Sequence, residues 1–295
     1  MTTLFRGSGV AIVTPFTAEN EVNYQKFAEL IEWHIQEGTD AIIACGTTGE
    51  APTLTDDEHK RVIECAVATA KKRIPIIAGT GSNDTAYAVQ LSQHAEKAGA
   101  DGLLCITPYY NRPTQKGLIA NFRAIADAVN LPIIMYNVPS RTGCNLLPET
   151  IAKLAEHKNI RGAKEASGNI AQVAEVARLV PDDFFLYSGN DDMIVPLMSL
   201  DGDGVISTVA NIVPKDTHNM VQYFLDGNVK AACELQLHMK PLIDAVFCET
   251  NPIPIKTAMN LMGMNVGALR LPMCDMEEKN LETLKRRMRE YGLLK

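Results

Sequence analysis

Several features that define large protein classes are missing from this chain of 295 residues. Its longest apolar runs, such as AIIAC at 41–45 and PIIMY at 132–136, have only the length of a strand. A helix that crosses a membrane needs about 20 apolar residues, so we expect no membrane partner. The first residues, MTTLFRGSGV, lack a basic segment followed by an apolar one. This start is not that of a signal peptide and predicts a cytoplasmic protein.

An excess of positive charge is also missing. The chain has 28 Lys and Arg against 35 Asp and Glu, which gives a net charge of −7. No basic stripe runs along the sequence, so we expect no nucleic-acid partner. Because hydrophobic residues make up 46% and charged residues 21%, the composition is that of an ordinary globular protein.

The cysteines form no motif. No CxxC pair occurs, and their number is odd, so we expect free, buried thiols in a reducing compartment and no disulfide framework. No histidine lies near any cysteine in a catalytic motif. The seven are scattered at Cys45, Cys65, Cys105, Cys144, Cys233, Cys248 and Cys274.

Metal and phosphate chemistry lack their usual signatures. A metal-dependent aldolase needs histidines at strand ends, and we expect all six histidines in helical segments. The acidic pairs Asp191-Asp192 and Asp201-x-Asp203 do not complete a calcium loop and are interpreted as solvated loop carboxylates. No phosphate cradle for pyridoxal phosphate is evident. We therefore expect neither a metal nor this cofactor. The six are His34, His59, His94, His157, His218 and His238.

What the chain does contain is a regular alternation of short apolar strands and amphipathic helices. Most strands are apolar on both faces, as in a covered parallel sheet. They begin roughly 20 to 34 residues apart, the length of a βα unit. Eight such units predict an α/β fold, a (β/α)8 TIM barrel. The predicted strands are 9–14, 41–45, 75–80, 102–107, 132–137, 160–165, 184–189 and 204–209. The predicted helices between them are 24–37, 55–72, 84–98, 148–157, 169–180 and 193–200.

An open doubly wound sheet is the competing fold, but it wants a glycine-rich phosphate loop after its first strand, and GSGVAIVTPF offers none. The strand pattern stops near residue 225 and three helical segments follow, at 229–247, 254–262 and 277–291. We predict a catalytic barrel over 1–224 and a C-terminal helical extension over 225–295. No low-complexity linker separates them, so the extension should pack on the barrel.

One lysine stands out because barrel chemistry gathers at the carboxyl ends of strands. Lys164, in IRGAKE, is the only lysine placed within a predicted strand. The neighbouring Glu165 points to the opposite face and is a poor partner for it. A lysine that has lost its water is neutral more often and attacks carbonyl carbons to form a Schiff base. We therefore interpret Lys164 as a nucleophile, against the alternative of a lysine that reaches solvent from a strand end.

The adjacent strand ends supply further groups of suitable chemistry. Tyr136 ends the strand before Lys164 and can donate and accept a proton, whereas a plain core aromatic is the alternative. Thr47 and Thr48 offer hydroxyls; Thr47 also fits a capping box, but Thr55 fits the next helix start better. Arg141 follows Tyr136 in a loop and suits a substrate carboxylate, unless it is a simple surface arginine.

The motifs GTTGEAPTLTDDEH, TPYYNRPTQKG, YNVPSRTG, KEASG and NPIPIK together resemble the dihydrodipicolinate synthases. These belong to the pyruvate-dependent aldolase superfamily, which also holds N-acetylneuraminate lyase. The resemblance runs from about residue 7 to the C-terminus. The GTTGE loop, the tyrosine of strand five and the lysine of strand six are superfamily motifs. YNVPSRTG, with its arginine, is the more specific mark of the synthases.

The resemblance implies a lyase reaction in the lysine and diaminopimelate pathway. Pyruvate forms an imine with Lys164, the derived enamine attacks L-aspartate 4-semialdehyde, and ring closure releases 4-hydroxytetrahydrodipicolinate. By position, Tyr136, Thr47 and Tyr110 match the proton relay of the family, with Tyr110 borrowed from a neighbouring subunit. The positions that match substrate-binding residues are Thr48 for pyruvate, Arg141 for the semialdehyde carboxylate, and Gly189 and Ile206 for the backbone that lines the site.

The resemblance also bears on assembly and regulation. A borrowed Tyr110 implies a homodimer at least, and the family is commonly a homotetramer built as a dimer of dimers. His59, Asn83 and Tyr109 match residues of an allosteric pocket that binds lysine. Asp56 stands where lysine-sensitive members have histidine, and Tyr87 where they have glutamate. We therefore expect weak or absent inhibition by lysine.

Two other functions stay open. A sugar-acid aldolase of the same superfamily would use the same lysine, but Arg141 in YNVPSRTG argues against a polyhydroxylated acceptor. A non-catalytic binding barrel would have no need for Lys164, Tyr136 and Thr47 together. Borohydride trapping of a pyruvate adduct on Lys164 separates a catalytic barrel from a binding one.

Overall fold

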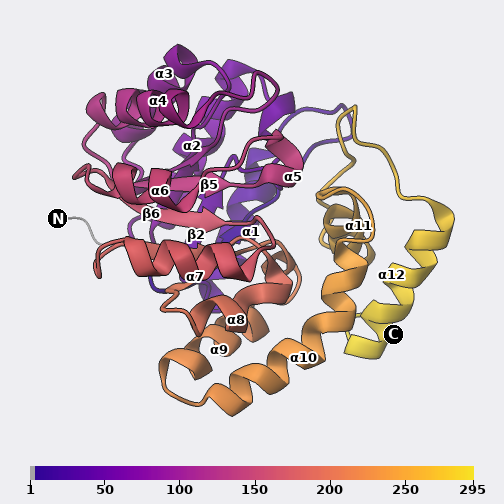
Figure 1. Cartoon of the computed structure of the whole chain (residues 1–295). Helices are drawn as coiled ribbons and strands as arrows, with labels where there is room; N and C mark the ends of the chain where they lie inside the picture. Colours follow the sequence, from indigo (N-terminus) through magenta and orange to yellow (C-terminus); the bar gives the residue numbers. More distant parts are fainter. Residues whose placement is uncertain (1–3) are drawn as a thin grey trace.

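The computed structural model describes residues 4–295 as eight parallel strands that close into a barrel (Figure 1). The strands follow one another around the barrel in sequence order, and the last pairs with the first. The predicted TIM barrel is therefore confirmed. The strands are β1 (Gly7–Ala11), β2 (Ala41–Ala44), β3 (Ile76–Gly79), β4 (Gly102–Ile106), β5 (Ile133–Asn137), β6 (Ile160–Glu165), β7 (Phe185–Ser188) and β8 (Gly204–Ser207).

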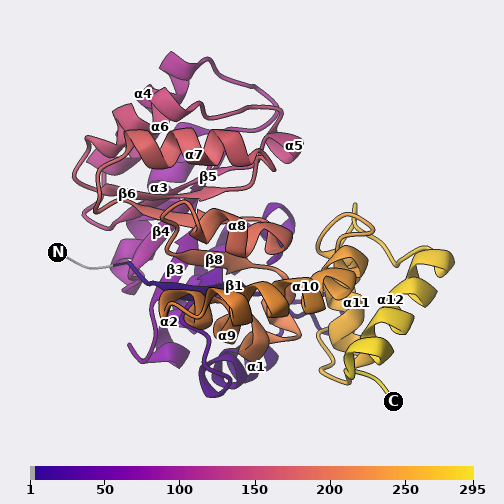
Figure 2. The same cartoon turned by 60° about the horizontal axis from the view of Figure 1, so that its bottom comes forward.

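Helices cover the outside of the barrel (Figures 1 and 2). Local signals set their ends: Thr55 and Glu58 form the predicted capping box, and Gly99 ends a helix in the left-handed conformation. The helices of this layer are α1 (Tyr24–Gln36), α2 (Asp56–Ala70), α3 (Thr85–Ala98), α4 (Gln115–Asp127), α5 (Pro139–Thr142), α6 (Pro148–Ala155), α7 (Ile170–Leu179), α8 (Ile194–Met198) and α9 (Pro214–Leu225).

The structure differs from the sequence prediction at several elements. Helices α4 and α9 were not predicted, although Thr114 caps the first and Pro214 opens the second, both ordinary start signals. Strand β1 ends before residue 12, because the Val13 amide leaves the ladder and donates to the Asn211 side chain. The expectation of helical histidines is wrong for His157, which lies in the turn after α6.

The expected burial of the cysteines is confirmed at three positions and wrong at two, and Cys65 and Cys233 are half-buried. All seven are free; Cys45, Cys105 and Cys144 are buried, but Cys248 and Cys274 are exposed. Burial raises the pKa of the Cys105 thiol to about 11, so this thiol is held in its neutral, unreactive form. The buried thiols act as small apolar groups of the core.

Apolar side chains fill both sides of the sheet. One cluster lies between the strands and the helices, and a second fills the barrel interior. The amino end of the barrel is closed by Phe5, whose ring stacks on Tyr187 at 4.6 Å between centroids. The Tyr187 hydroxyl, buried with its ring, donates to the Phe5 carbonyl. Among the described residues, this end of the barrel is therefore filled by side chains.

Three helices follow α9 and lie beside the carboxyl end of the barrel, where Figure 2 labels them α10, α11 and α12. They are α10 (Val229–Val246), α11 (Ile253–Leu261) and α12 (Glu278–Tyr291). Helix α10 packs on α9, and α12 packs on α10. Their apolar side chains join the cluster that covers the outside of the barrel. The boundary at residue 225 between barrel and extension stays a prediction.

Across residues 4–295, no helix has both the length and the apolar character that crossing a membrane requires.

The segment after α11 approaches the β1–α1 loop closely. The Phe16 amide donates to the Val266 carbonyl at 3.0 Å. Gly267 has φ +80°, and a Cβ added there would lie 2.1 Å from the Phe16 carbonyl oxygen. Gly263, in the same segment, has φ +79° but no atom within 4 Å of an added Cβ. The two glycines thus share a backbone conformation and differ only in the space around them.

This difference predicts unequal effects of alanine. Gly263→Ala should lower the free energy of unfolding by about 1–2 kcal/mol, the cost of a left-handed alanine. Gly267→Ala should cost roughly 1–3 kcal/mol more, because the Phe16 backbone must also move. Chemical denaturation of both variants measures the difference. Equal losses of unfolding free energy in the two variants would show that the segment after α11 moves without cost and is not tightly packed against the barrel.

Candidate active site

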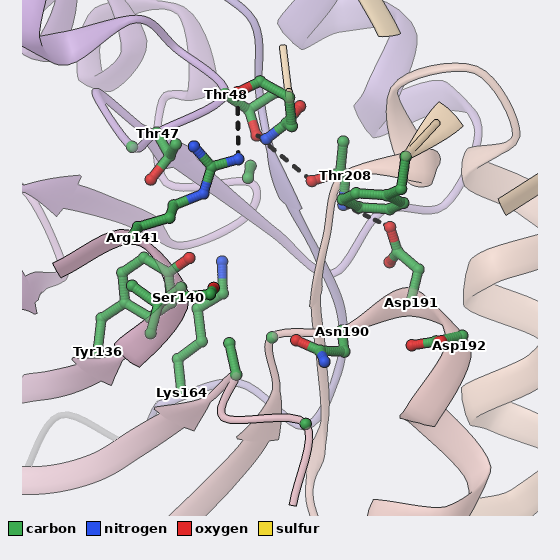
Figure 3. A pocket seen from close by; sticks show the side chains of 18 of the residues that line it. Thr47, Thr48, Tyr136, Ser140, Arg141, Lys164, Asn190, Asp191, Asp192 and Thr208 are labelled. Carbon is green, nitrogen blue, oxygen red and sulfur yellow. Dashed lines mark hydrogen bonds between the residues drawn. The ribbon is translucent and has the colours of Figure 1, made fainter. Parts of the chain in front are cut away.

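A cavity of about 340 Å³ lies at the carboxyl ends of the strands, where the sequence predicted the chemistry (Figure 3). The ends of strands β2, β5, β6 and β7 supply most of its wall. The outer side is supplied by Ile243 and Asp244 of helix α10 and by Phe247, which caps that helix. Six of the predicted site residues line this cavity: Thr47, Thr48, Tyr136, Arg141, Lys164 and Gly189.

Lys164 lies within β6 and points into this cavity. Its strand register places it beside Tyr136, and its Nζ lies 4.3 Å from the centre of the Tyr136 ring. Only 5% of the side chain's surface is exposed. Burial lowers the pKa of Lys164 to about 7; the Asp191 carboxylate opposes this shift and the Arg141 guanidinium adds to it. A large share of the amine is therefore neutral near pH 7.

Glu165 points to the other face of the strand, as its position in the alternation requires. Its carboxylate accepts hydrogen bonds from the Asn137 side chain at 3.0 Å and from the Ser167 amide at 2.7 Å. Gln172 on α7 donates to the same carboxylate. The prediction that Glu165 is not the partner of Lys164 agrees with these contacts. Glu165 instead holds the turn after β6 in place.

Tyr136 is the last residue but one of β5, with its ring packed in the barrel interior and its hydroxyl toward the cavity. Burial raises the pKa of Tyr136, while the Arg141 charge and the Thr47 hydroxyl partly offset the rise. The phenol is thus a neutral hydrogen-bond donor near pH 7, with a threonine hydroxyl beside it. This is the arrangement that passes a proton between a bound substrate and a second hydroxyl.

Thr48 lies one residue along the same turn and is buried. Its Oγ1 accepts a hydrogen bond from the Asn251 side chain at 2.9 Å and lies 3.4 Å from Thr208 Oγ1 (Figure 3). Because the hydroxyl already has these partners, its direction is fixed. A fixed hydroxyl at the cavity floor suits one oxygen of a small carboxylate.

Arg141 was predicted in a loop but lies in the short helix α5, directly after β5. Its side chain reaches over the cavity mouth, where one terminal nitrogen donates to the Asn251 carbonyl at 3.2 Å. The remaining N–H groups of the guanidinium face the cavity region and can take a second carboxylate. Asn251 therefore contacts both Thr48 and Arg141.

The two predicted backbone positions differ in their placement. Gly189 lines the cavity, and its amide donates to the Glu165 carbonyl at 2.8 Å. A Cβ at Gly189 would lie 2.7 Å from the Ala166 side chain and 3.0 Å from Lys164 Cε, so only glycine fits. Ile206 is fully buried in the barrel interior and is not among the residues that line the cavity.

Tyr110 lies outside the cavity of its own chain. It follows β4 with φ 71° and leaves 90% of its surface exposed. The adjacent Asn111 side chain donates to the Asn83 carbonyl, which fixes this loop against the one after β3. The structure therefore presents Tyr110 to the outside rather than bringing it to Lys164.

The residues predicted for an allosteric pocket lie around α2, away from Lys164. His59 is buried, its Nε2 lies 2.8 Å from the Gly79 carbonyl oxygen, and burial lowers its pKa. The Tyr87 hydroxyl donates to the Asp56 carboxylate, and burial with this bond raises the pKa of Tyr87 to about 12. Tyr109 is half-buried and close enough to add to that rise.

The interpretation of the acidic pairs as solvated is wrong for two carboxylates. Asp191 is only 2% exposed, and its Oδ2 accepts hydrogen bonds from the backbone amides of Thr208 and Val209. Burial raises the pKa of Asp191, and these bonds oppose the rise. Asp203 pairs with Arg6 and caps the Leu186 amide. The place of Asp191 in the site could have been predicted from the sequence, because it follows the end of β7, although its burial could not.

Two further polar residues escaped the sequence reasoning because they come from the C-terminal extension. Asn251 lines the cavity, and Lys256 is a second buried lysine, 1% exposed, paired with Glu50 at 2.8 Å. Both lie in the NPIPIK motif. Within residues 4–295, no three His, Cys, Asp or Glu side chains cluster as ligands of a metal ion would.

Known proteins are similar to this sequence over nearly its whole length. The model of the dihydrodipicolinate synthetase family matches residues 4–291. A 4-hydroxy-tetrahydrodipicolinate synthase of Thermoanaerobacter sp. (strain X514) is 59% identical over 293 residues, which cover 99% of this chain and 98% of the relative.

Solved structures agree. The crystal structure of dihydrodipicolinate synthase from Aquifex aeolicus is 44% identical, with a TM-score of 0.96, and the match covers 98% of this chain and 99% of that one. A dihydrodipicolinate synthase described as the first monomeric variant is 42% identical with the same TM-score, over 98% of both chains. The chain belongs to the dihydrodipicolinate synthetase family.

Proposed function

We propose that the cavity condenses pyruvate with L-aspartate 4-semialdehyde, the reaction of a 4-hydroxy-tetrahydrodipicolinate synthase. The observation that carries the proposal is the buried Lys164 amine, whose pKa is lowered to about 7 at the floor of a polar cavity. Full-length relatives at 59% identity bear that enzyme's name. Through this reaction the protein is a lyase of lysine and diaminopimelate biosynthesis.

The first step joins pyruvate to the chain. The neutral amine of Lys164 attacks the ketone carbon of pyruvate, and loss of water from the carbinolamine gives an imine. Tyr136 donates the proton that the departing oxygen needs, and Thr47 passes a proton on. The Thr48 hydroxyl donates a hydrogen bond to the pyruvate carboxylate. Loss of a methyl proton then converts the imine to an enamine.

The second step forms the carbon–carbon bond. The enamine carbon attacks the aldehyde of L-aspartate 4-semialdehyde, whose carboxylate binds Arg141 at the cavity mouth. The amino group of the second substrate then replaces Lys164 at the imine carbon, which closes the ring and frees the lysine. The imine itself serves as the electron sink, so we propose that neither a metal nor pyridoxal phosphate takes part. Seven free cysteines fit a cytoplasmic enzyme.

The decisive experiment is reductive trapping on Lys164. Pyruvate with cyanoborohydride should add the reduced pyruvate mass to the peptide that holds Lys164, and Lys164→Ala should abolish the adduct. Lys153→Ala, which removes an exposed lysine on α6, is the control and should keep the adduct. Unmodified Lys164 in an active preparation would contradict the proposal.

The pH dependence of the same trapping follows from the charges beside the amine. Below a pH of about 7 Lys164 is protonated and cannot attack, so the trapping rate should rise with pH through this value and then level off. Arg141→Gln removes a cation and should move the midpoint to higher pH, whereas Asp191→Asn should move it lower. Asp192→Asn, at the exposed neighbour, is the control. Midpoints that coincide in all four proteins would refute this origin of the pKa.

We propose further that Tyr110 completes the cavity of a neighbouring copy in a homodimer or homotetramer. Its support is the 90% exposure of a tyrosine whose family position belongs to the relay. One similar structure belongs to a monomeric variant, so family membership alone does not decide the assembly. If Tyr110 acts in the site of a neighbouring subunit, assemblies that mix two inactive variants should regain activity.

In that arrangement, Lys164→Ala and Tyr110→Phe should each be nearly inactive alone. Co-expression of the two, with different tags, should restore activity in the hetero-assembly, because one site then holds both Lys164 and a borrowed Tyr110. Wild type carrying the same two tags is the control. Purified hetero-assemblies without activity would mean that Tyr110 serves its own chain, and an active Tyr110→Phe protein would mean that Tyr110 serves no site.

Around His59, Asn83 and Tyr109 we propose an allosteric pocket that responds weakly to lysine. The Asp56 carboxylate is already shared by Lys60 and Tyr87, and no carboxylate stands at position 87 to take a bound ammonium group. L-lysine at about 1–5 mM should therefore change the initial rate by less than about twofold. Tyr87→Glu should increase the response. Strong inhibition of the unmodified enzyme would contradict the proposal.

A further inference from the structure

A buried ion pair joins the C-terminal extension to the turn that carries Thr47 and Thr48. Lys256, on α11, and Glu50, at the end of the turn, leave 1% and 3% of their surfaces exposed. Lys256 Nζ donates to Glu50 Oε1 at 2.8 Å, to the Ala268 carbonyl at 2.7 Å and to the Thr14 carbonyl at 3.2 Å. The ammonium thus uses all three of its donors.

The second oxygen of Glu50 is also taken by the extension. Its Oε2 accepts the Arg270 backbone amide at 3.0 Å. The Arg270 side chain goes elsewhere, to a bidentate pair with Glu58 at the start of α2. Both carboxylate oxygens of Glu50 are therefore held by the C-terminal extension, although Glu50 itself belongs to the barrel.

The pair is a poor choice if stability is its only purpose. Two charges removed from water lose their hydration, and a well-packed apolar pair of similar volume is commonly as stable or more stable. What an ion pair gives that an apolar pair does not is direction: its hydrogen bonds fix the positions of both heads. The position of Glu50 matters because of the turn it ends.

The turn is too compact for Glu50 to move alone. The Glu50 backbone is left-handed, with φ 53°, and the Glu50 amide donates to the Thr47 carbonyl at 3.1 Å. The Gly49 amide closes on the Gly46 carbonyl at 3.1 Å, and Thr14 Oγ1 holds the Gly49 carbonyl at 2.7 Å. A shift of Glu50 therefore carries Thr47 and Thr48 with it.

We propose that Glu50 and Lys256 are positioning residues for the condensation: their ion pair anchors the turn at 46–50, and so holds the hydroxyls of Thr47 and Thr48 toward Lys164. The inference rests on the proposed function, since it assigns the turn a task in that reaction. Neither residue lines the cavity, so both act through the turn and not on the substrate.

The test is the double variant Glu50→Gln/Lys256→Met, which removes both charges and leaves no unpaired ion. Its melting temperature should stay within a few degrees of the wild type, because neither head is left buried and alone. Its kcat/KM for pyruvate should fall roughly 10- to 100-fold, because a small misplacement of acting groups costs that much. Its KM for the semialdehyde, which Arg141 binds, should change less than about twofold.

Arg270→Met is the matched control. It breaks the ion pair with Glu58, a second link between extension and barrel, but keeps the backbone amide that Glu50 accepts. It should lower the melting temperature and leave both KM values and kcat within about twofold of the wild type. If the double variant does not fold, Glu50→Asp carries the same test, since it keeps both charges and shortens the anchor by one methylene.

Wild-type kinetics in a folded double variant, or in Glu50→Asp, would overturn the inference. The inference would also be overturned if Arg270→Met lost activity in proportion to its loss of stability. Absence of a pyruvate adduct on Lys164 in the wild type is a separate result and would refute the proposed function. Adduct formation in the wild type with the predicted split in the variants supports both.

Discussion

Removal of water from one amine is the constraint on which the rest of the site depends. Lys164 keeps only 5% of its surface exposed, and this burial is the largest cause of its lowered pKa. A barrel strand can hold a lysine in this way because apolar neighbours wall it on both sides while the strand end stays open to substrate. The packed amino end, closed by Phe5 and Tyr187, confines that opening to one side.

Two nearby charges have opposite effects on the protonation of the Lys164 amine. Attack on a ketone requires the neutral form, but the imine that follows is most reactive when it carries a positive charge. Arg141 favours the neutral amine, and Asp191 favours the charged state. Asp191 can stay buried because the amides of Thr208 and Val209 replace its lost water. The site therefore keeps the balance near neutral pH without fixing either protonation state.

Sequence alone predicted the parts of this site that follow local periodicity. Lys164, Tyr136 and Thr48 are found because strand alternation and strand ends can be read from the chain. The burial of Asp191 could not be predicted from the sequence, because it depends on backbone amides that follow β8, 17 residues away. Asn251 is farther still: it reaches Thr48 across 203 residues, and no local pattern encodes that contact. Helix α4, by contrast, carried the ordinary start signal Thr114 and was predictable.

These long-range contacts make the C-terminal extension part of the wall of the site. Asn251 donates to Thr48 and accepts from Arg141, so one residue of the extension sets the spacing between the two groups proposed to bind the two substrates. Helix α10 lines the outer side of the cavity, and Lys256 holds the turn through its hydrogen bond to Glu50. A barrel without the extension would keep the nucleophile on β6 but would leave the turn of Thr47 and Thr48 held from one side only. The chemistry therefore arises where the two segments meet, although the nucleophile belongs to the barrel.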